Sequence, residues 1–221
     1  MGAAIGAIIG LAVGVAISPV PIIAVILMLF SPKARQNSVA FLLGWLVGLV
    51  VVGTLVLVAD VSSSDSGEST TSGWVKLILG VLLLALAWRS WSGRPQGDRE
   101  PEMPKWMSSI DGFAPGKSFG LAALLSGVNP KNLALTAAAA ASIGAAGLSS
   151  GQEFATLAVF VVIASLTVAL PVVFYLALGE RADPTLTVWK DWLQANNATV
   201  MVVLLAVFGA KLIGDGIAIL S

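Results

Sequence analysis

Two stretches of the sequence, GVAISPVPII (residues 14–23) and LLSGVNPKNL (residues 124–133), interrupt long apolar runs in the same way. In each stretch a residue with a side-chain oxygen, Ser18 or Asn129, stands directly before a proline. This pair favours the start of a helix, because the side-chain oxygen accepts hydrogen bonds from free amides while proline has no amide to satisfy. We therefore predict that each stretch ends one half-helix and begins another inside a hydrophobic segment.

The composition around these stretches indicates a membrane protein. Of the 221 residues, 57% are apolar and only 11% are charged, whereas about 25% are charged in a typical soluble domain. The mean hydropathy is +0.94, so one water-facing domain cannot hide the apolar surface and lipid must be the solvent. Because 12 basic residues balance 12 acidic ones, there is no net positive charge and we expect no nucleic-acid partner.

Several kinds of chemistry are excluded by residues that the sequence lacks. It contains no cysteine and no histidine, which removes disulfides, thiol redox chemistry, imidazole proton relays and most transition-metal sites. The stretch DGFAPGKS (residues 111–118) is close to a phosphate-binding loop, but its first glycine is one place out of register and no strand precedes it. We predict no catalytic residues, no metal, no cofactor and no enzymatic activity.

Apolar runs long enough to cross a bilayer recur along the chain. A hydrocarbon core of about 30 Å needs about 20 helical residues, and runs of that order cover residues 2–30, 39–59, 74–91, 118–143, 154–178 and 198–220. The remaining residues suffice for connectors but not for a second soluble domain of typical size. The sequence therefore predicts an all-α polytopic membrane protein, with six transmembrane helices in a single membrane domain (residues 1–221).

The basic residues favour one orientation of these helices. Nine of the 12 lie in or beside the first, third and fifth connectors: Lys33, Arg35, Arg89, Arg94, Arg99, Lys105, Lys117, Arg181 and Lys190. The second connector instead carries Asp60, Asp65 and Glu68. Because Lys and Arg concentrate in cytoplasmic loops, we predict that the three basic connectors are cytoplasmic and that both termini are outside.

The third connector, residues 92–117, combines charges of both signs with four prolines, which is typical of a flexible linker. Its second half places Met103, Trp106, Met107 and Ile110 at helical spacing. Two interpretations remain open. The segment is either an interfacial helix lying on the inner leaflet or a short surface helix packed on the bundle.

This linker separates two halves, residues 1–91 and 118–221, and each half opens with one of the proline stretches. Superposing Pro19 on Pro130 aligns the two stretches. Each half has three predicted spans, and because three is odd the second half must cross the membrane in the opposite sense. This predicts two inverted three-helix repeats, with the first helix of each repeat broken by its proline motif.

The two breaks are the predicted substrate site, because broken helices at membrane depth line a cavity or are buried in protein. Half-helix amino ends and the ammonium group of Lys131 would attract an anion or a polar head group. In the alternative interpretation these residues only shape the bundle. The predicted substrate-binding residues are Ser18, Pro19, Pro21, Asn129, Pro130, Lys131 and Asn132.

Two further patterns lie outside the breaks. Glycine recurs at every fourth position near the start of the chain: Gly2, Gly6, Gly10 and Gly14. A face without side chains lets helix backbones approach closely, so these glycines predict helix packing within the bundle or in a homodimer. In the last apolar run Lys211 and Asp215 stand one turn apart, which fits either a coupling pair for transport or a passive ion pair.

Together, SPVP (residues 18–21) and MPKWMSSIDGFAPGKSFGLAALLSGVNPKNLAL (residues 103–135) carry a family resemblance. The chain resembles the GAP family, the peptidoglycolipid and sulfolipid addressing proteins of the LysE superfamily. That resemblance covers essentially the full length, and its most specific part is VNPKN with the upstream tryptophan and Ile-Asp. It implies six spans and a role in moving large glycolipids or related envelope lipids toward the cell surface, beside other transport machinery.

We therefore predict a multi-pass protein of the bacterial inner (plasma) membrane that exports or flips a glycolipid or another anionic envelope lipid. A membrane lipid is the expected substrate, and a larger lipid-export machinery is a possible partner. Two alternatives stay open. One is an exporter of amino-acid-like solutes of the LysE superfamily, and the other is a scaffold for a lipid pump that transports nothing itself.

Overall fold

The computed structural model describes residues 1–61, 70–94 and 105–221 of the chain, and in these parts all regular structure is helical. The elements are α1 (Gly2–Ala16), α2 (Pro19–Leu29), α3 (Ala34–Val61), α4 (Thr70–Ser92), η1 (Lys105–Gly112), α5 (Pro115–Gly127), α6 (Pro130–Gly144), α7 (Ser150–Leu178), η2 (Gly179–Ala182) and α8 (Asp183–Leu220). The predicted all-α class is confirmed for the described residues. Asp65, Glu68, Arg99 and Met103, which entered the predictions above, lie outside them.

Three helical stretches of the described chain are long and apolar enough to cross a membrane: Ala34–Ala59, Gly73–Ser92 and Ser150–Leu220. A fourth crossing is counted if α1 and α2, which meet at a bend of 53°, form one broken span. The expectation of several apolar helices of spanning length is confirmed. The finer prediction of six spans in inverted repeats stays a prediction.

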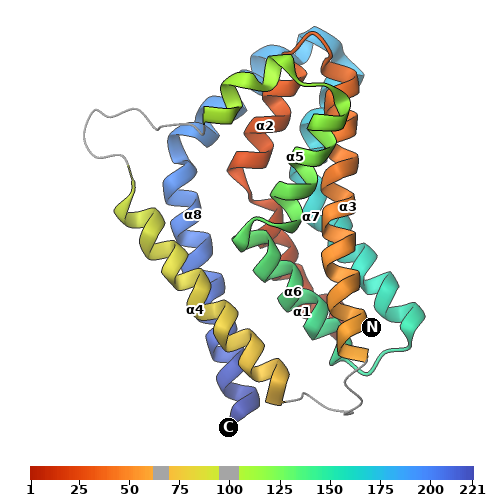
Figure 1. The fold of residues 1–221 in the computed structure, drawn as a ribbon, viewed down its shortest axis with the longest axis vertical. Helices are drawn as coiled ribbons and strands as arrows, with labels where there is room; N and C mark the ends of the chain where they lie inside the picture. The colour runs from red at the N-terminus through yellow and green to blue at the C-terminus, as the bar shows by residue number, and fades with distance from the viewer. Residues whose placement is uncertain (62–69, 95–104) are drawn as a thin grey trace.

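Both predicted breaks are present. Helix α1 ends at Ala16 and α2 begins at Pro19, while α5 ends at Gly127 and α6 begins at Pro130. Figure 1 shows the two broken pairs running in opposite directions, with α1 and α6 in the lower half of the view and α2 and α5 in the upper half. The breaks therefore fall at the same level of the bundle.

The half-helices beyond the breaks form the centre of the molecule. Nine of the 11 residues of α2 and 10 of the 15 residues of α6 are buried. A helix that is hydrophobic on every side is stable only where protein or lipid surrounds it, and here the neighbours are protein. Helix α3 packs on α5 and α6, and α7 packs on α1 and α2.

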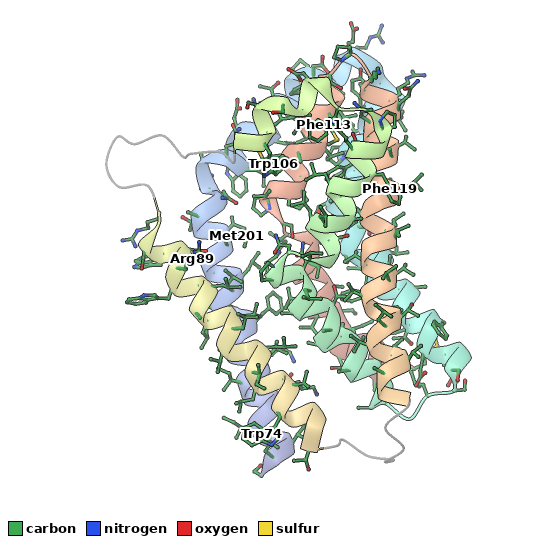
Figure 2. All side chains as sticks on the ribbon, in the orientation of Figure 1. Trp74, Arg89, Trp106, Phe113, Phe119 and Met201 are labelled. Atoms are coloured by element: carbon green, nitrogen blue, oxygen red, sulfur yellow. The ribbon has the colours of Figure 1, made fainter. Side chains whose placement is uncertain are left out.

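The outer helices expose large apolar side chains, the reverse of a water-soluble surface. Leu55 of α3, Val162 of α7 and Val188 of α8 are 60–65% exposed. On α4, exposed tryptophans stand near both ends, with Trp74 close to its start and Trp88 close to its end. Figure 2 labels Trp74 at the lower end of this helix. Tryptophans at both ends of an apolar helix are typical of a membrane span.

Helices α4 and α8 lie side by side along their length (Figure 1) and approach through glycines. A Cβ on Gly80 would lie 2.8 Å from the Gly209 carbonyl oxygen, and a Cβ on Gly216 would lie 2.8 Å from the Gly73 carbonyl oxygen. Both helices thus carry a glycine pair spaced by seven residues on their shared face. The sequence analysis missed this contact, although the equal spacing in two apolar runs was a readable signal.

The helix expected in the third connector is a short 3-10 helix, η1, and it packs on the bundle. Met107 and Ile110 are 6% and 1% exposed. Trp106 and the following Phe113 are partly buried against the same core, and both lie at the upper end of the molecule in Figure 2. Of the two open interpretations, the structure therefore supports the short helix packed on the bundle.

Candidate functional site

The last turn of α1 has carbonyl groups that need hydrogen-bond donors from outside the helix. Proline at positions 19 and 21 removes two amide hydrogens just beyond the helix end, so carbonyl groups in the last turn of α1 lose their usual helical partners. Ala16 and Ser18 are only 5% and 2% exposed, so water does not replace these partners, and each buried, unpaired carbonyl costs about 1–3 kcal/mol. The break therefore requires donors from elsewhere in the protein.

Local donors close part of the break. The hydroxyl of Ser18 lies 2.6 Å from the carbonyl oxygen of Val15, and the amide of Ser18 donates to the carbonyl of Ala16 at 2.8 Å. The hydroxyl of Thr167, from α7, also donates to the Ala16 carbonyl. Ser18 thus closes the carboxyl end of α1, and its side chain makes no capping bond to α2. The prediction that Ser18 caps the following half-helix is wrong in this respect.

Lys131, at the amino end of α6, supplies the remaining donors. Its ammonium nitrogen donates to the carbonyl of Gly14 at 2.8 Å, the carbonyl of Ile17 at 3.0 Å and the hydroxyl of Ser18 at 2.7 Å. These three acceptors match the three hydrogens of an ammonium group. Because the carboxyl end of a helix carries partial negative charge, it is also a favourable place for a cation. One side chain from the second break thereby completes the first.

Two asparagines organise the second break. Asn129 accepts a hydrogen bond from the backbone amide of Lys131 at 3.1 Å, which confirms the predicted cap of α6. Asn132 donates to the carbonyl of Leu125 in the last turn of α5 at 2.9 Å, and its amide oxygen lies 3.1 Å from the Ser18 hydroxyl. We call Ser18, Lys131, Asn132 and Thr167 the polar junction.

The polar junction joins three of the seven predicted substrate-binding residues in one buried cluster. Ser18, Lys131 and Asn132 are 2%, 3% and 0% exposed. The predicted prolines at positions 19 and 130 are the first residues of the half-helices α2 and α6, and Pro21 follows in the first turn of α2. They shape the break but present no polar side-chain atom to a ligand.

The junction differs from the sequence-based picture in its charge geometry. The expectation was that both helix amino ends and Lys131 face a shared polar chamber. Instead, the Lys131 ammonium faces the carboxyl end of α1 and all three of its hydrogens are used. Prolines occupy two of the first three positions of α2, so this helix start has few amides for an anion. The structure therefore shows a closed junction.

Thr167 was not among the predicted site residues. Its only local signal was a hydroxyl in an apolar run four residues before Pro171, the position whose carbonyl loses its helical partner to that proline. Its contact to the carbonyl of Ala16 spans 151 positions of the chain. A sequence pattern within one helix cannot predict a contact with another helix.

An apolar groove of about 440 Å³ reaches the junction from the side of the bundle. Ile22 of α2 and Thr167 and Pro171 of α7 line it. Its outer part is formed on α8, where Val188 and Trp192 are 65% and 58% exposed. Of the four junction residues, Thr167 is the one that lines this groove.

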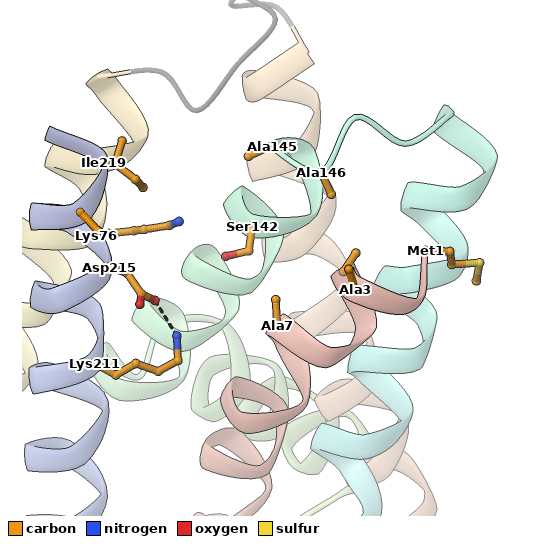
Figure 3. Close-up of a pocket in the computed structure, with 12 residues that line it drawn as sticks. Met1, Ala3, Ala7, Lys76, Ser142, Ala145, Ala146, Lys211, Asp215 and Ile219 are labelled. Carbon is orange, nitrogen blue, oxygen red and sulfur yellow. Dashed lines mark hydrogen bonds and ion pairs between the residues drawn. The ribbon is translucent and has the colours of Figure 1, made fainter. Parts of the chain in front are cut away.

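The predicted pair Lys211–Asp215 lies elsewhere, at the end of the molecule where α8 finishes. The two side chains form an ion pair at 2.5 Å and are 44% and 39% exposed. They line a cavity of about 490 Å³ together with Lys76 of α4, as Figure 3 shows. The sequence analysis passed over Lys76, whose signal was a lone lysine inside an apolar run. Whether the ion pair couples transport to an ion stays a prediction.

The predicted glycine face of α1 is close-packed at one end only. A Cβ on Gly14 would lie 2.5 Å from the ring of Phe208, and one on Gly10 would just touch that ring at 4.0 Å. A Cβ on Gly2 or Gly6 would meet nothing within 4 Å. The proposed homodimer contact of this face stays a prediction.

Within the described residues, no group of three or more acidic, histidine or cysteine side chains could hold a metal ion. The polar side chains at the two breaks are one lysine, two asparagines and two hydroxyls, and they offer hydrogen bonds and one positive charge. Side chains of this kind form hydrogen bonds with polar or anionic groups.

Comparison with known proteins adds the family. No curated protein and no solved structure matches the chain. A family model described as "Sap, sulfolipid-1-addressing protein" matches residues 8–218, a range that includes both breaks, Thr167 and the Lys211–Asp215 pair. This match supports the resemblance to the addressing proteins, while the wider LysE superfamily stays a prediction. The chain therefore belongs to the family of the sulfolipid-1-addressing protein Sap.

Proposed function

We propose that this protein moves a glycolipid or another anionic envelope lipid across the plasma membrane toward the cell surface. The observation that carries the proposal is the meeting of two broken helices at one buried lysine, with all three ammonium hydrogens given to the opposite break. A lysine inside an apolar bundle is costly and marks a functional position by default. The family's description as an addressing protein for a sulfolipid supports a lipid as the substrate.

The proposed architecture has six spans in two inverted repeats. Each bent or broken pair, α1–α2 and α5–α6, is taken as one crossing, and α3, α4, α7 and α8 supply the others. Three features support this count. The two broken pairs run in opposite directions (Figure 1), the stretch Ser150–Leu220 has 71 residues and is long enough for two crossings, and α4 and α8 pair through matching glycines.

The polar junction is the proposed head-group site, and the arrangement with all three Lys131 hydrogens in use is proposed to be its closed state. A sulfate, phosphate or carboxylate on the substrate would compete with the α1 carbonyls for the Lys131 ammonium, because charge-assisted hydrogen bonds to an anion are stronger than those to a neutral carbonyl. Binding of such a group would favour conformations in which the half-helices separate. Lys131 is thus proposed to hold the closed state together and to bind the substrate in the open one.

The apolar groove favours a lipid over an amino-acid-like solute. Its lining is apolar apart from Thr167, which also belongs to the polar junction. A small zwitterion gains nothing from such a surface, whereas an acyl chain of a membrane lipid matches it and would leave the head group at the polar end. We therefore assign the groove to one acyl chain of the transported lipid.

The test of this function is Lys131→Met in cells, with lipids of the surface and of the whole cell measured separately. We expect the surface lipid to fall and the same lipid to accumulate inside, while the amount of protein in the membrane stays near normal. Lys117→Met is the matched control, because Lys117 is an exposed lysine at the start of α5 and far from any break contact.

Other outcomes would replace the proposal. Normal surface lipid in the Lys131→Met strain would remove the junction as the substrate site. Accumulation of one amino acid on deletion of the gene, with unchanged envelope lipids, would identify a small-solute exporter. Loss of lipid export on altering the exposed Gly2 and Gly6 face, with Lys131→Met tolerated, would identify a scaffold that acts through a second copy or through a larger lipid-export machinery.

A further inference from the structure

The aromatic ring of Phe208, on α8, packs directly on the backbone of Gly14 in α1. A Cβ built on Gly14 would lie 2.5 Å and 2.7 Å from two carbons of this ring, whereas one on Gly10 would lie 4.0 Å away, an ordinary contact. Only glycine therefore leaves room for the ring at position 14. Gly14 is buried and Phe208 is 9% exposed, so the contact is close to dry.

This contact adjoins the polar junction. The carbonyl of Gly14 accepts a hydrogen bond from the Lys131 ammonium, so the ring packs on a residue that the junction uses. Leu135 closes the same place from α6, one turn beyond Lys131, and its side chain would lie 3.0 Å from a Cβ on Gly14. Two apolar side chains, Phe208 and Leu135, therefore border the junction here.

On the other side of Phe208 lies the cavity of about 490 Å³, which we call the Lys211 cavity. Phe208 and Lys211 share one face of α8, three positions apart. Ala7 lines the cavity two turns before the glycine that meets the ring, and Ser142 lines it two turns beyond the leucine of α6. Figure 3 shows Ala7 and Ser142 on the wall opposite Lys211. On all three helices, the Phe208 contact thus stands between the cavity and the junction.

The helix that carries Phe208 is held mainly elsewhere. Helix α8 packs along α4 through the backbone contacts of their glycines, and much less on α1 and α6. A contact between two backbones is rigid, whereas an aromatic side chain can change its rotamer or withdraw with its helix. Closure between α8 and α1 therefore depends on an element that can move.

We propose that Phe208 is a gate between the polar junction and the Lys211 cavity. While its ring lies on Gly14, the junction has no passage to the cavity. When the ring moves away, a head group at Lys131 can pass into the cavity, which has the size of a small-molecule site. The inference rests on the proposed function for the identity of the passing group, but the gate is tested without lipid transport.

The experiment measures whether a thiol in the junction can be reached from the Lys211 cavity. The natural chain has no cysteine, so Ser18→Cys places a single thiol in the junction. Spheroplasts and inside-out vesicles that contain the full chain are treated with a membrane-impermeant methanethiosulfonate reagent, and mass spectrometry gives the labelling rate. Ala7→Cys, at an exposed position of the cavity, identifies the side to which the cavity opens.

We expect the thiol of Ser18→Cys to react slowly from both sides. Adding Phe208→Ala should raise its labelling rate about tenfold or more, and only from the side that labels Ala7→Cys. Adding Gly14→Ala should have the same effect with the ring still present, because the new methyl group would occupy the place of the ring.

Two matched controls separate a gate from general loosening. Phe41→Ala also removes a buried phenylalanine, which is 0% exposed on α3, a helix that packs on α5, α6 and α7. Gly10→Ala adds a methyl group on the same helix as Gly14→Ala but at an ordinary contact distance from the ring. Neither change should alter the labelling rate of Ser18→Cys.

Each result decides the proposal. Unchanged labelling in both the Phe208→Ala and Gly14→Ala backgrounds overturns the gate, and so does equal acceleration from both sides or by the controls. If Phe208→Ala fails to fold, Gly14→Ala decides, and Leu135→Cys is a second reporter if Ser18→Cys fails. A gate confirmed by labelling, together with normal surface lipid in Lys131→Met cells, would keep the gate and remove the lipid as the passing group.

Discussion

At the scale of single residues, the hydroxyl of Ser18 shows how a broken helix is tolerated inside an apolar bundle. It donates a hydrogen bond to the Val15 carbonyl and accepts one from the Lys131 ammonium. Removing it leaves one carbonyl without its donor and one ammonium hydrogen without its acceptor. A similar hydroxyl in an unbroken helix matters less, because the backbone amide already satisfies the carbonyl that it contacts.

This difference predicts unequal effects of the same substitution at two buried serines. Ser18→Ala should lower the free energy of unfolding by about 1–3 kcal/mol. Ser165→Ala is the control, because Ser165 is 4% exposed and donates at 2.6 Å to the Val161 carbonyl of its own continuous helix. Ser165→Ala should lower the free energy of unfolding by about 0.5 kcal/mol. Thermal unfolding of both variants in detergent measures the difference, and equal losses would contradict the role given to the break.

At the scale of helices, short half-helices depend on their neighbours. Helices α2 and α6 have 11 and 15 residues, fewer than the about 20 that cross a bilayer alone. In the proposed topology each half-helix crosses the membrane together with its partner across the break, and the polar junction connects the two pairs. By contrast, α4 and α8 are unbroken and associate through backbone contact at glycines, as small residues allow between membrane helices.

From the close contact of α4 with α8, we expect Gly80→Ala to push these two helices apart. The new methyl group would lie 2.7 Å from the Ile213 side chain and 2.8 Å from the Gly209 carbonyl oxygen. The backbone oxygen cannot rotate away, so we expect a loss of about 1–3 kcal/mol in the free energy of unfolding, typical of an overpacked contact.

Gly214→Ala, on the partner helix α8, is the control for this change, because a Cβ at Gly214 would meet nothing within 4 Å. This variant should unfold at or above the temperature of the unchanged protein, since alanine favours a helix more than glycine does. A Gly80→Ala protein as stable as the Gly214→Ala protein would show that the two helices do not touch at this point.

At the scale of the whole molecule, the proposed topology places the two ends of the bundle on opposite sides of the membrane. The natural chain has no cysteine, so a single introduced cysteine reports its side without background. Ser150, at the start of α7, and Gln36, near the start of α3, are both exposed and mark opposite ends of the bundle.

We expect Ser150→Cys to react with a membrane-impermeant maleimide in intact spheroplasts, and Gln36→Cys to react only after the membrane is opened. The reason is the concentration of basic residues in the connectors on the Gln36 side. The reverse pattern would show that the protein has the opposite orientation in the membrane. Labelling of both positions from outside would rule out the six-span topology. Mass spectrometry of the labelled protein measures each outcome.

How much could be predicted from the sequence depends on the distance over which each interaction acts along the chain. The apolar helices, the positions of both breaks and the cap at Asn129 follow from neighbouring residues, because helix starts and stops are decided within a few positions. The contact of Lys211 with Asp215 is equally local, since residues one turn apart on a helix are neighbours. The packing of η1 was one of two interpretations that its spacing left open.

The sequence by itself therefore determined a membrane class and where its helices break. Only the tertiary structure decided what satisfies the breaks. Lys131 meets a carbonyl 117 positions away and Thr167 meets one 151 positions away, and Lys76 reaches the cavity of Lys211 from another helix. The physical reason is that unpaired carbonyls in an apolar bundle accept whichever donor the packing brings near. That choice belongs to the arrangement of the helices, which no short pattern along the chain encodes.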